Sequence, residues 1–394
     1  MTIGFLLNTS EPYYRGGYEQ RALSFGRALV RQGHDVCVYT SCPCDETVEG
    51  IRFVRLAPPR PYFNARGVRN GWADILFAFD ILKLLWQPGI RDLDVLDVCA
   101  TPFIHLPFVA VVSWFRRVPV VITCHEALLI SIPAYTRERG NRNPVIAWLF
   151  TRIFILLYRL GMGLFCRRLA NSRGTFEALA KEGYPASGIV ETGIDQETYN
   201  TQPPEPLPET EPVRFVFCGR LTPIKSVDQS LAALFPLCDE PRAFHFDIVG
   251  DGAERSRLER MVREADAEKW ITFHGQVPDE TKRAILAGSE IFILSSPREG
   301  LSLATIEAMA GGCGALIVND PKCPTGALDF VRHGQEGLVV LPGVEPMRTA
   351  LRLLLRDAPL RLALRRAAWQ TAQAYHIETQ AEKLAAFYRQ SCSD

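Results

Sequence analysis

Short apolar runs that end in small or polar residues recur along the chain, and a stretch with helical periodicity follows each. In the first half the runs are TIGFLLN, VCVYTS, DVLDVC, PVVITC and GIVETG. In the second half they are RFVFCG, FHFDIVG, ITFHG, IFILSS, ALIVND and GLVVL. Nearly continuous Val, Ile, Leu and Phe runs that alternate with helices are typical of parallel strands buried on both faces. The pattern predicts an α/β protein built of doubly wound parallel sheets.

The alternation of strands and helices stops once, at residues 201–212, and then starts again. This stretch, TQPPEPLPETEP, has five prolines and three glutamates, which is typical of a linker. A chain of 394 residues is also longer than one ordinary core requires. We therefore expect a Rossmann-like domain over 1–200 and a second over 213–375, with the terminal helix 376–394 returning to the first. Ligands of such folds bind beyond the carboxyl ends of the strands, so two facing domains would enclose a cleft.

Two long apolar stretches raise the question of a membrane. Residues 98–115 are free of charge if His105 is neutral, but two prolines argue against a single spanning helix. Residues 145–166 are interrupted by two arginines. We expect both stretches to form helices that face the core. The alternative for the second is a helix that lies along a bilayer surface with its apolar face down.

Composition and charge narrow the class of protein. The apolar and charged fractions, 47% and 22%, are those of a soluble globular protein, and the net charge of zero does not favour nucleic acid as a partner. Residues 1–195 nevertheless hold 22 Lys and Arg against 17 Asp and Glu, and residues 196–394 hold 22 against 27. A basic first half suits an anionic ligand or an anionic membrane surface, and it is equally compatible with ordinary scatter. We expect a cytoplasmic protein, with the cytoplasmic membrane surface as an alternative location.

The eleven cysteines do not indicate a disulfide framework. Most of them lie in apolar runs, where Cys behaves as a small buried hydrophobic residue, and their number is odd. The sequence starts directly on a strand-like run with no signal peptide. Reduced thiols are the simplest expectation.

Several strand ends have residues that suit an anionic ligand. Gly16 and Gly17 precede a helix, where backbone amides and the helix N-terminus attract anions, although a plain turn explains them equally well. The strand RFVFCG runs into GRLTPIKS, which places Arg220 and Lys225 five residues apart. Two cations at one strand end suit a diphosphate, and a solvated loop is the alternative interpretation.

Glu299 and Glu307 flank the start of a predicted helix in the segment IFILSSPREGLSLATIEAMAGG. Glu299 lies in the loop after a strand, where a carboxylate can accept hydrogen bonds from sugar hydroxyls. Glu307 lies within an apolar helical pattern, and a carboxylate buried there needs a partner. A vicinal diol such as a ribose is one candidate partner. Sugar, phosphate and ribose would then follow one another as in a sugar nucleotide, whereas the alternative is one surface and one core-edge glutamate.

Two other motifs carry less weight. The Gly-x-Gly at 250–252 follows a strand, but Arg255 occupies the place of a third glycine, so no dinucleotide fingerprint is present. The Asp-x-Asp at 92–94 suggests a metal-dependent, single-domain glycosyltransferase, yet it precedes its strand rather than following it. We therefore expect no essential metal and no other cofactor.

The motifs together resemble glycosyltransferase family 4, the retaining enzymes of the two-domain GT-B fold. The resemblance rests on GGYE, ANS at 170–172, ETGID, CGRLTPIKSVD, VGDG, FHGQVPDE, EGLSLATIEAMAGG with its E-x7-E spacing, and CPTG at 323–326. Their order and spacing extend over nearly the whole chain. Three positions depart from the family pattern: Ser226 and Ser302 stand where glycine is usual, and Asp329 stands where glutamate is usual.

The resemblance implies roles for individual residues. Arg220 and Lys225 would bind the donor diphosphate and stabilise charge on the leaving nucleotide. Glu299 would hold hydroxyls of the donor sugar, Glu307 would hold the ribose, and His125 would face the sugar near the reacting carbon. Without the resemblance, His125 reads as a satisfied core or loop histidine. Further donor-binding positions would be Gly16, Gly17, Gln276, Val277, Gly300, Leu301, Ser302 and Leu303.

The expected function is retaining transfer of a hexose-type sugar from a nucleoside diphosphate sugar to a hydroxyl group. We expect UDP rather than GDP as the nucleotide, although no motif decides between them. The acceptor, which the first domain would bind, could be a glycan, a lipid-linked molecule or a small molecule. Peripheral membrane contact through that domain stays open. A catalytically silent sugar-nucleotide-binding protein is the alternative, but it would not need to keep all four of Arg220, Lys225, Glu299 and Glu307.

Overall fold

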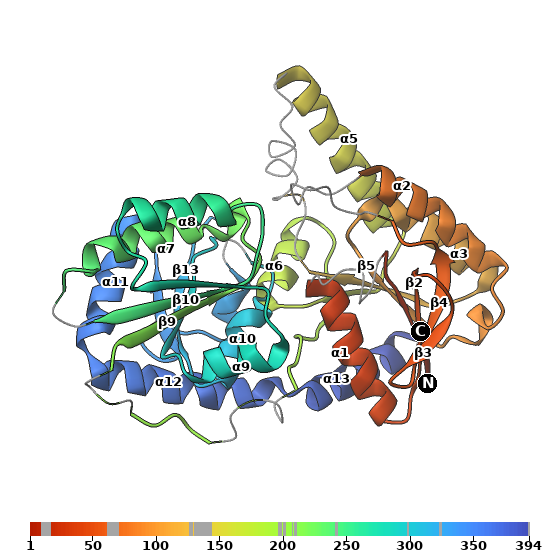
Figure 1. Ribbon diagram of the computed structural model, residues 1–394. Coiled ribbons are helices and arrows are strands. Elements are labelled where there is room, and N and C mark those ends of the chain that lie inside the picture. Colours follow the sequence, from red (N-terminus) through yellow and green to blue (C-terminus); the bar gives the residue numbers. More distant parts are fainter. Residues whose placement is uncertain are drawn as a thin grey trace. The chain divides into compact units, whose positions relative to one another are not determined.

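The chain divides into two compact units, and each is described here by itself. Unit 1 comprises Met1–Gly193 and Ile377–Asp394, and unit 2 comprises Ile194–His376. This computed structural model (Figure 1) describes residues 1–8, 17–60, 71–125, 129, 144–195, 199, 202–206, 208, 211–240, 243–297, 299–322 and 325–392.

Unit 1 is built on a sheet with the strand order β3-β4-β2-β1-β5-β6-β7-β8. All of its described strand pairs are parallel except β3 with β4, an antiparallel hairpin at one edge that the apolar pattern does not predict. The strands are β1 Thr2–Leu6, β2 Asp35–Ser41, β3 Glu46–Val48, β4 Ile51–Ala57, β5 Val95–Cys99, β6 Val120–Cys124, β7 Arg168–Ala170 and β8 Gly188–Ile189.

Helices cover both faces of the first sheet, and each face has its own apolar core. The helices are α1 Gly17–Arg31, α2 Gly71–Asp80, α3 Leu106–Arg116, α5 Pro144–Gly163, α6 Arg173–Lys181 and α13 Ile377–Cys392. One core contains side chains of α1 and α13, and the other contains side chains of α2, α3 and α5. Because α13 packs on α1, this core of unit 1 contains residues from both the first and the last helix of the chain.

Unit 2 has an entirely parallel sheet with the order β11-β10-β9-β12-β13-β14. In order along the chain this is 3-2-1-4-5-6, the doubly wound order in which the direction of winding reverses between the first and fourth strands. The strands are β9 Val213–Cys218, β10 Phe244–Val249, β11 Ile271–Gly275, β12 Ile291–Leu294, β13 Gly314–Val318 and β14 Gly337–Val340. The helices are α7 Val227–Leu234, α8 Arg255–Glu264, α9 Asp279–Ala287, α10 Leu303–Ala310, α11 Val344–Arg356 and α12 Ala358–Ala372.

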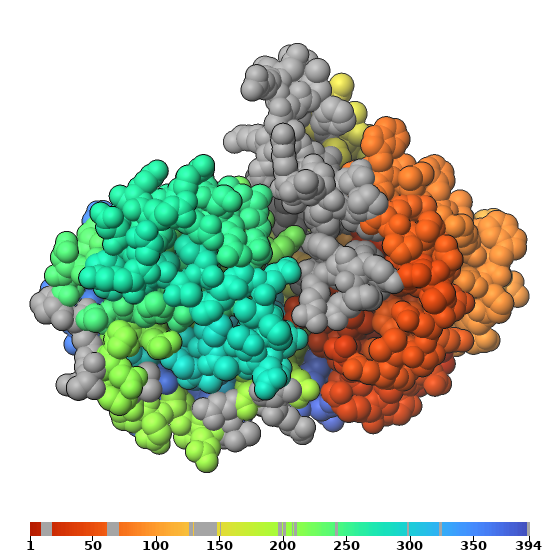
Figure 2. All heavy atoms as spheres, in the orientation of Figure 1, coloured from red at the N-terminus to blue at the C-terminus, as the bar shows by residue number. Residues whose placement is uncertain are grey.

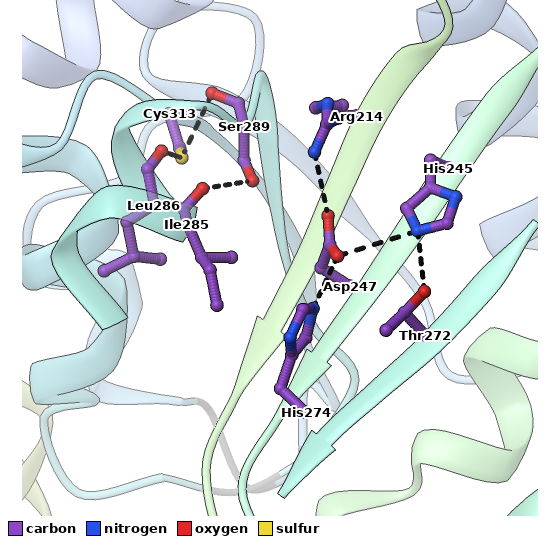
Figure 3. Close-up of polar contacts among 9 residues, drawn as sticks. All are labelled: Arg214, His245, Asp247, Thr272, His274, Ile285, Leu286, Ser289 and Cys313. Carbon is purple, nitrogen blue, oxygen red and sulfur yellow. Dashed lines mark hydrogen bonds and ion pairs between the residues drawn. The ribbon is translucent and has the colours of Figure 1, made fainter. Parts of the chain in front are cut away.

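A buried carboxylate joins three strands of the second sheet (Figure 3). Asp247 on β10 is 3% exposed, and its Oδ1 lies 2.7 Å from Nε2 of His274 on β11. His245 lies two residues earlier on β10, 3.6 Å from the same oxygen, and its Nε2 is 3.0 Å from Oγ1 of Thr272. Arg214 on β9 lies 3.7 Å from the other carboxylate oxygen. The hydrogen bond with His274 and the nearby charge of Arg214 compensate for the burial of this carboxylate.

The two ends of unit 2, at Ile194 and His376, are neighbours in space although they are far apart along the chain. The backbone amide of Ile194 donates to the carbonyl of Tyr375 at 2.8 Å, and Ile194 forms a parallel bridge with His376. The contacts therefore divide the chain before Ile194, ahead of the Pro-rich stretch 201–212. Within that stretch, the carbonyl of Glu205 accepts a hydrogen bond from Arg365 on α12 at 3.0 Å, which ties it to unit 2.

The expectation of core-facing helices at 98–115 and 145–166 is only half right. The helices form, as α3 and α5, and each buries one apolar face; Tyr158 of α5, for example, is 1% exposed. Each also presents apolar side chains outward, and Leu156 is 57% exposed. An apolar pattern all round a helix does not show whether neighbouring elements cover its whole circumference. Within the described part of the chain, no helix combines the length and apolar content needed to cross a bilayer.

The nine cysteines whose side chains the structure describes are all free thiols, as expected from the sequence. Burial raises the pKa of Cys124 and Cys313 to about 12, so these two thiols are protonated and unreactive at neutral pH.

Candidate functional site

The candidate site of unit 2 lies at the point where its sheet changes winding direction. Strands β9 and β12 are neighbours in the sheet but are separated by β10 and β11 along the chain. Their carboxyl ends are followed by the loops that carry Arg220 and Lys225 after β9 and Glu299 after β12. Loops at such a switch point diverge from each other, which leaves room for a ligand.

Glycines allow the loop after β10 to pack directly on the loop after β9. A Cβ at Gly250 would lie 2.0 Å from the carbonyl oxygen of Gly219, and one at Gly252 would lie 2.3 Å from that of Leu221. The amide of Leu221 donates to the carbonyl of Asp251 at 2.9 Å. The VGDG segment therefore holds the loop that carries Arg220, and no side chain larger than hydrogen fits at either glycine.

Lys225 and Glu299 form an ion pair across the switch point. Lys225 donates to Oε1 of Glu299, and their side chains are largely buried. The hydroxyl of Ser296 donates to the same carboxylate oxygen, and that of Ser295 donates to the carbonyl of Lys225 at 2.7 Å. The sequence predicts separate ligand contacts for the two residues, and the structure brings them together in one hydrogen-bonded cluster. Arg220 lies on the same loop with an exposed side chain.

A second glycine contact fixes the loop of Glu299. The amide of Gly326 donates to the carbonyl of Glu299 at 2.9 Å, and a Cβ at Gly326 would lie only 1.7 Å from the carbonyl oxygen of Gly300. Leu301 is buried in the adjacent apolar core, and Leu303 is the first residue of α10. The loop is therefore anchored on both sides of Gly300.

Both helices at the switch point begin after a serine with a left-handed backbone. Ser226, before α7, has φ 50°, and Ser302, before α10, has φ 64°. These are the two positions where the sequence departs from the glycines of the motif. Glycine adopts this conformation without a steric penalty, whereas a residue with a Cβ does so at a cost. The backbone thus explains the glycine preference at both positions.

Glu307 has partners inside the protein. It is 8% exposed on α10, and the ammonium of Lys282 on α9 donates to its Oε1 at 2.9 Å. Tyr199 also hydrogen-bonds to it: burial, together with the charge and hydrogen bond of Glu307, raises the pKa of that phenol. Burial alone would lower the pKa of Lys282, but Glu307 raises it overall. The partner that burial of Glu307 requires is therefore present within the protein, because Lys282 and Tyr199 both contact the carboxylate, and a contact with ribose stays a prediction.

Three further predicted donor-binding positions have described places in the two units. Gln276 and Val277 follow β11, at the same edge of the second sheet, with Gln276 exposed and Val277 packed on the apolar core. Gly17 is the first residue of α1 in unit 1. Gly16 lies outside the described residues.

His125 follows β6 in unit 1 and is held by two neighbours. Its Nδ1 accepts a hydrogen bond from Nδ2 of Asn171 at 3.3 Å, and its ring meets Tyr18 edge-on with centroids 4.9 Å apart. Its Nε2 is buried and has no hydrogen-bond partner among the residues that the structure describes. Burial, and then the positive charge of Arg21, lower the pKa of His125 to about 3. The imidazole is therefore neutral at physiological pH, with an N–H at Nε2 when Nδ1 accepts.

A buried polar network lies near this histidine. Asp97 on β5 accepts hydrogen bonds from Thr123 at 2.8 Å and from Tyr388 of the terminal helix. Burial raises the pKa of Asp97, although the charge of Arg21 opposes the shift. Arg21 is itself buried, and it donates to the carbonyl of Val190 at 2.9 Å. The network joins α1, the sheet and α13.

Sequence reasoning missed Lys282, Tyr199, Asn171 and Arg21 as neighbours of the predicted residues. Lys282 lies in the polar helix DETKRAILA, where a lysine normally indicates a solvated face. Asn171 belongs to the ANS motif and lies directly after β7 in the parallel sheet. Only the strand order, which places β7 beside β6, connects it with His125.

Comparison with known proteins agrees with this geometry. Residues 15–198 match the family model Glycosyltransferase Family 4, and residues 199–371 match the model Glycosyl transferases group 1. The glycogen synthase of Mycobacterium tuberculosis is 25% identical over 370 residues, which cover 88% of this chain and 84% of that protein. The 2-deoxystreptamine glucosyltransferase of Streptomyces kanamyceticus is 30% identical over 151 residues, a match that spans only 38% of each chain.

Solved structures extend the likeness over the whole chain. Sucrose-phosphate synthase from Thermosynechococcus elongatus superposes with a TM-score of 0.76 at 18% identity, covering 99% of this chain and 98% of its own. Anabaena HepE in complex with UDP and glucose gives 0.71 at 18% identity and 98% coverage of both chains. At such identities the likeness establishes the fold. Taken with the two family models, which adjoin and together span residues 15–371, it shows that the chain belongs to the family 4 glycosyltransferases and has their GT-B fold.

Proposed function

We propose that this glycosyltransferase moves a hexose-type sugar from a nucleoside diphosphate sugar, UDP in preference to GDP, to an acceptor hydroxyl with retention of configuration. The acceptor would be a glycan, a lipid-linked molecule or a small molecule. The observation that carries the proposal is the cluster at the switch point of unit 2, where Lys225 and Glu299 meet on the loops after β9 and β12.

The cluster suits a diphosphate sugar because it combines cations with a hydrogen-bond acceptor. Arg220 and Lys225 would contact the diphosphate oxygens and stabilise the charge that develops on the leaving group. Glu299 would accept hydrogen bonds from the hydroxyls of the sugar. Its ion pair with Lys225 holds the carboxylate in position.

In the proposed transfer, the acceptor oxygen forms a bond to the anomeric carbon as the bond from that carbon to the phosphate oxygen breaks. Attack on the face that the phosphate leaves gives retention, and the acceptor proton moves to the departing phosphate. His125 does not take this proton, because a base with a pKa of about 3 has little affinity for it at neutral pH. Its proposed role is to donate a hydrogen bond from Nε2 to the transferred sugar.

The assignment of a nucleotide sugar as the donor is supported by what related proteins are described as binding. Among the structural neighbours, HepE is in complex with UDP-glucose, and Arabidopsis starch synthase IV is bound to ADP and acarbose. A Mycobacterium tuberculosis relative, 30% identical over 42% of this chain, is a GDP-mannose-dependent mannosyltransferase that acts on a phosphatidylinositol dimannoside. These descriptions support a nucleotide sugar as the donor and leave the sugar to experiment.

A panel of UDP-, GDP- and ADP-sugars tests the proposal through protection from thermal unfolding and release of nucleoside diphosphate. The donor should raise the unfolding temperature by mass action. Arg220→Ala should reduce turnover by about one to two orders of magnitude, because it removes a charge-assisted contact. Lys225→Ala also removes the partner of Glu299, so Lys225→Arg, which keeps the charge, separates the two effects. Lys269→Ala, an exposed cation elsewhere in unit 2, is the matched control.

Each outcome discriminates among the alternatives. Full activity of both Arg220→Ala and Lys225→Ala would remove the diphosphate assignment. Binding of a nucleotide sugar without any turnover, across a broad set of acceptors, would favour the silent binding protein. Complete and magnesium-reversible loss of activity in EDTA would revive the metal-dependent alternative.

A further inference from the structure

Exposed apolar side chains are concentrated on one group of helices. Of the 16 large hydrophobic residues that are exposed in the described part of the chain, 13 lie on α2, α3 and α5 or directly beside them. Only two lie in unit 2. Single exposed hydrophobic residues are normal, but a contiguous group of this size indicates a surface that binds something.

Helix α5 carries the longest part of this surface. Leu149, Ile153, Leu156, Leu160 and Leu164 follow one another at spacings of three or four residues, so they form one stripe along the helix and its end. Each is between 43% and 57% exposed. The opposite side of the helix packs on the rest of unit 1, so the stripe is a second apolar face that no core of the described residues covers.

Two arginines border the stripe along one side. Arg152 and Arg159 are exposed and lie three residues after Leu149 and Leu156, about 60° round the helix from it. The guanidinium of Arg152 lies 5.4 Å from the ring of Trp148, which is 59% exposed. An apolar stripe flanked by cations and a tryptophan is the pattern of a helix that lies in the interface of a bilayer.

Helices α2 and α3 continue the surface. Figure 1 shows α2, α3 and α5 on the same side of the first sheet, and α3 packs against both of the others. Phe79 of α2 meets Phe108 of α3 edge-on at 5.0 Å. Trp114 of α3 is 75% exposed, and Trp86, shortly after α2, is 77% exposed. The orange atoms of this part of the chain lie on the outside of unit 1 in Figure 2.

Tryptophan and charge both point to the kind of surface that would cover this face. Four of the six tryptophans in the chain are exposed on it, and Trp is the residue that favours the boundary between headgroups and acyl chains. Helices α3 and α5 contain no acidic residue, and Arg117, Arg152 and Arg159, which lie on them or directly after them, are exposed. Lipid headgroups with negative charge are complementary to such a face.

We propose that the apolar face formed by α2, α3 and α5 docks this glycosyltransferase on an anionic phospholipid bilayer, with the α5 stripe in the interface. A second copy of the chain is a poorer occupant, because a two-fold interface would set the same arginine-bearing face against itself. The inference goes beyond the proposed sugar transfer and does not depend on which donor or acceptor is used. The proposal also explains why α5 is apolar on both sides, although only one side packs on the rest of unit 1.

Co-sedimentation with vesicles of phosphatidylcholine alone, or of phosphatidylcholine with one quarter phosphatidylglycerol, tests the proposal. The wild-type protein should bind the anionic vesicles, and its tryptophan emission should shift to shorter wavelength. Leu156→Ser with Leu160→Ser should weaken the partition into vesicles by about tenfold or more, since it removes two apolar side chains that would be buried in the bilayer interface. Arg152→Gln with Arg159→Gln should weaken binding to the anionic vesicles and reduce its dependence on salt.

The matched control is Leu341→Ser with Leu353→Ser, which replaces two exposed leucines of unit 2 and should leave vesicle binding unchanged. Circular dichroism and soluble nucleotide release show whether each variant is folded. Failure of the folded wild-type protein to bind either vesicle would overturn the proposal. So would a dimer in solution that the α5 variant dissociates, if vesicle binding is the same for wild type and variant.

Discussion

At the scale of single residues, His125 shows how burial and a neighbouring cation act in the same direction. Both disfavour the imidazolium, so the pKa falls to about 3. A histidine in this state is a fixed hydrogen-bonding group rather than a proton carrier. Its folded-state pKa lies below the unfolded value of about 6.5. It therefore contributes stability that is present above pH 6.5 and lost as the pH falls from 6.5 toward 3.

This linkage predicts a difference between variants in acid. Between pH 7 and pH 4.5 the wild-type protein should lose about 2.5–3 kcal/mol of unfolding free energy through His125, because each of the two pH units below the unfolded pKa of about 6.5 costs about 1.4 kcal/mol. His125→Asn should lack this loss, whereas His333→Asn, which changes a histidine of unit 2, should keep it. Urea unfolding of all three proteins at both pH values measures the effect. Equal losses in wild type and His125→Asn would mean that His125 is protonated in the folded state.

Glu299 and Glu307 should divide the donor between them. Glu307→Gln should weaken both the donor and the free nucleoside diphosphate, because both contain the ribose. Glu299→Gln should weaken the donor and leave the free nucleoside diphosphate nearly unaffected, because its partner is the sugar. The loss should be about 1–3 kcal/mol per contact, measured by calorimetric titration of both ligands.

The pairing of Glu307 with Lys282 supplies the control for that experiment. Lys282→Met removes one of the two internal partners but keeps the carboxylate, so it should retain most of the affinity for nucleoside diphosphate if Glu307 contacts the ribose. If Lys282→Met and Glu307→Gln weaken binding equally, the pair serves to hold α9 against α10, and the ribose assignment fails. The double variant shows how far the two effects are coupled.

At the scale of elements, the helices α7 and α10 both begin at a backbone position that suits glycine. Because Ser226 and Ser302 adopt φ 50° and 64°, each has a steric cost that glycine avoids. Glycine in turn loses more backbone entropy on folding, which offsets part of the gain.

Replacement of these serines by glycine should therefore stabilise unit 2 slightly. Ser226→Gly and Ser302→Gly should each raise the unfolding free energy by about 0.5–1 kcal/mol after the entropic offset. Ala304→Gly, two residues into the same helix α10, should lower it by about 1 kcal/mol, because its backbone is helical. Thermal unfolding of the three variants with and without nucleoside diphosphate gives both stability and binding. Destabilisation by all three would show that the serine hydroxyls contribute more than the backbone strain.

At the scale of the whole molecule, the sequence is sufficient to predict the two doubly wound sheets. Most of their strands are buried and so appear as apolar runs. Strands β3 and β7 are missed because strands of three residues carry too few apolar positions to form a pattern, and β4 is missed because Arg52 and Arg55 interrupt its apolar run. The loop positions of Arg220, Lys225 and Glu299 follow from strand ends alone. The pairing of Lys225 with Glu299 and that of Glu307 with Lys282 depend on which strands and helices become neighbours. A local sequence pattern does not contain that information.

The return of α13 to unit 1 has a consequence for the order in which the protein is made. Unit 2 ends at His376, so all of its strands and helices have been synthesised before the helix Ile377–Cys392 is complete. Unit 1 starts first, yet its core lacks Leu384 and Tyr388, and Asp97 lacks one of its donors, until the last turns of the chain appear. The first segment of unit 1 is therefore synthesised before unit 2, but its core is completed only after unit 2, and its uncovered sheet is exposed to aggregation in the interval.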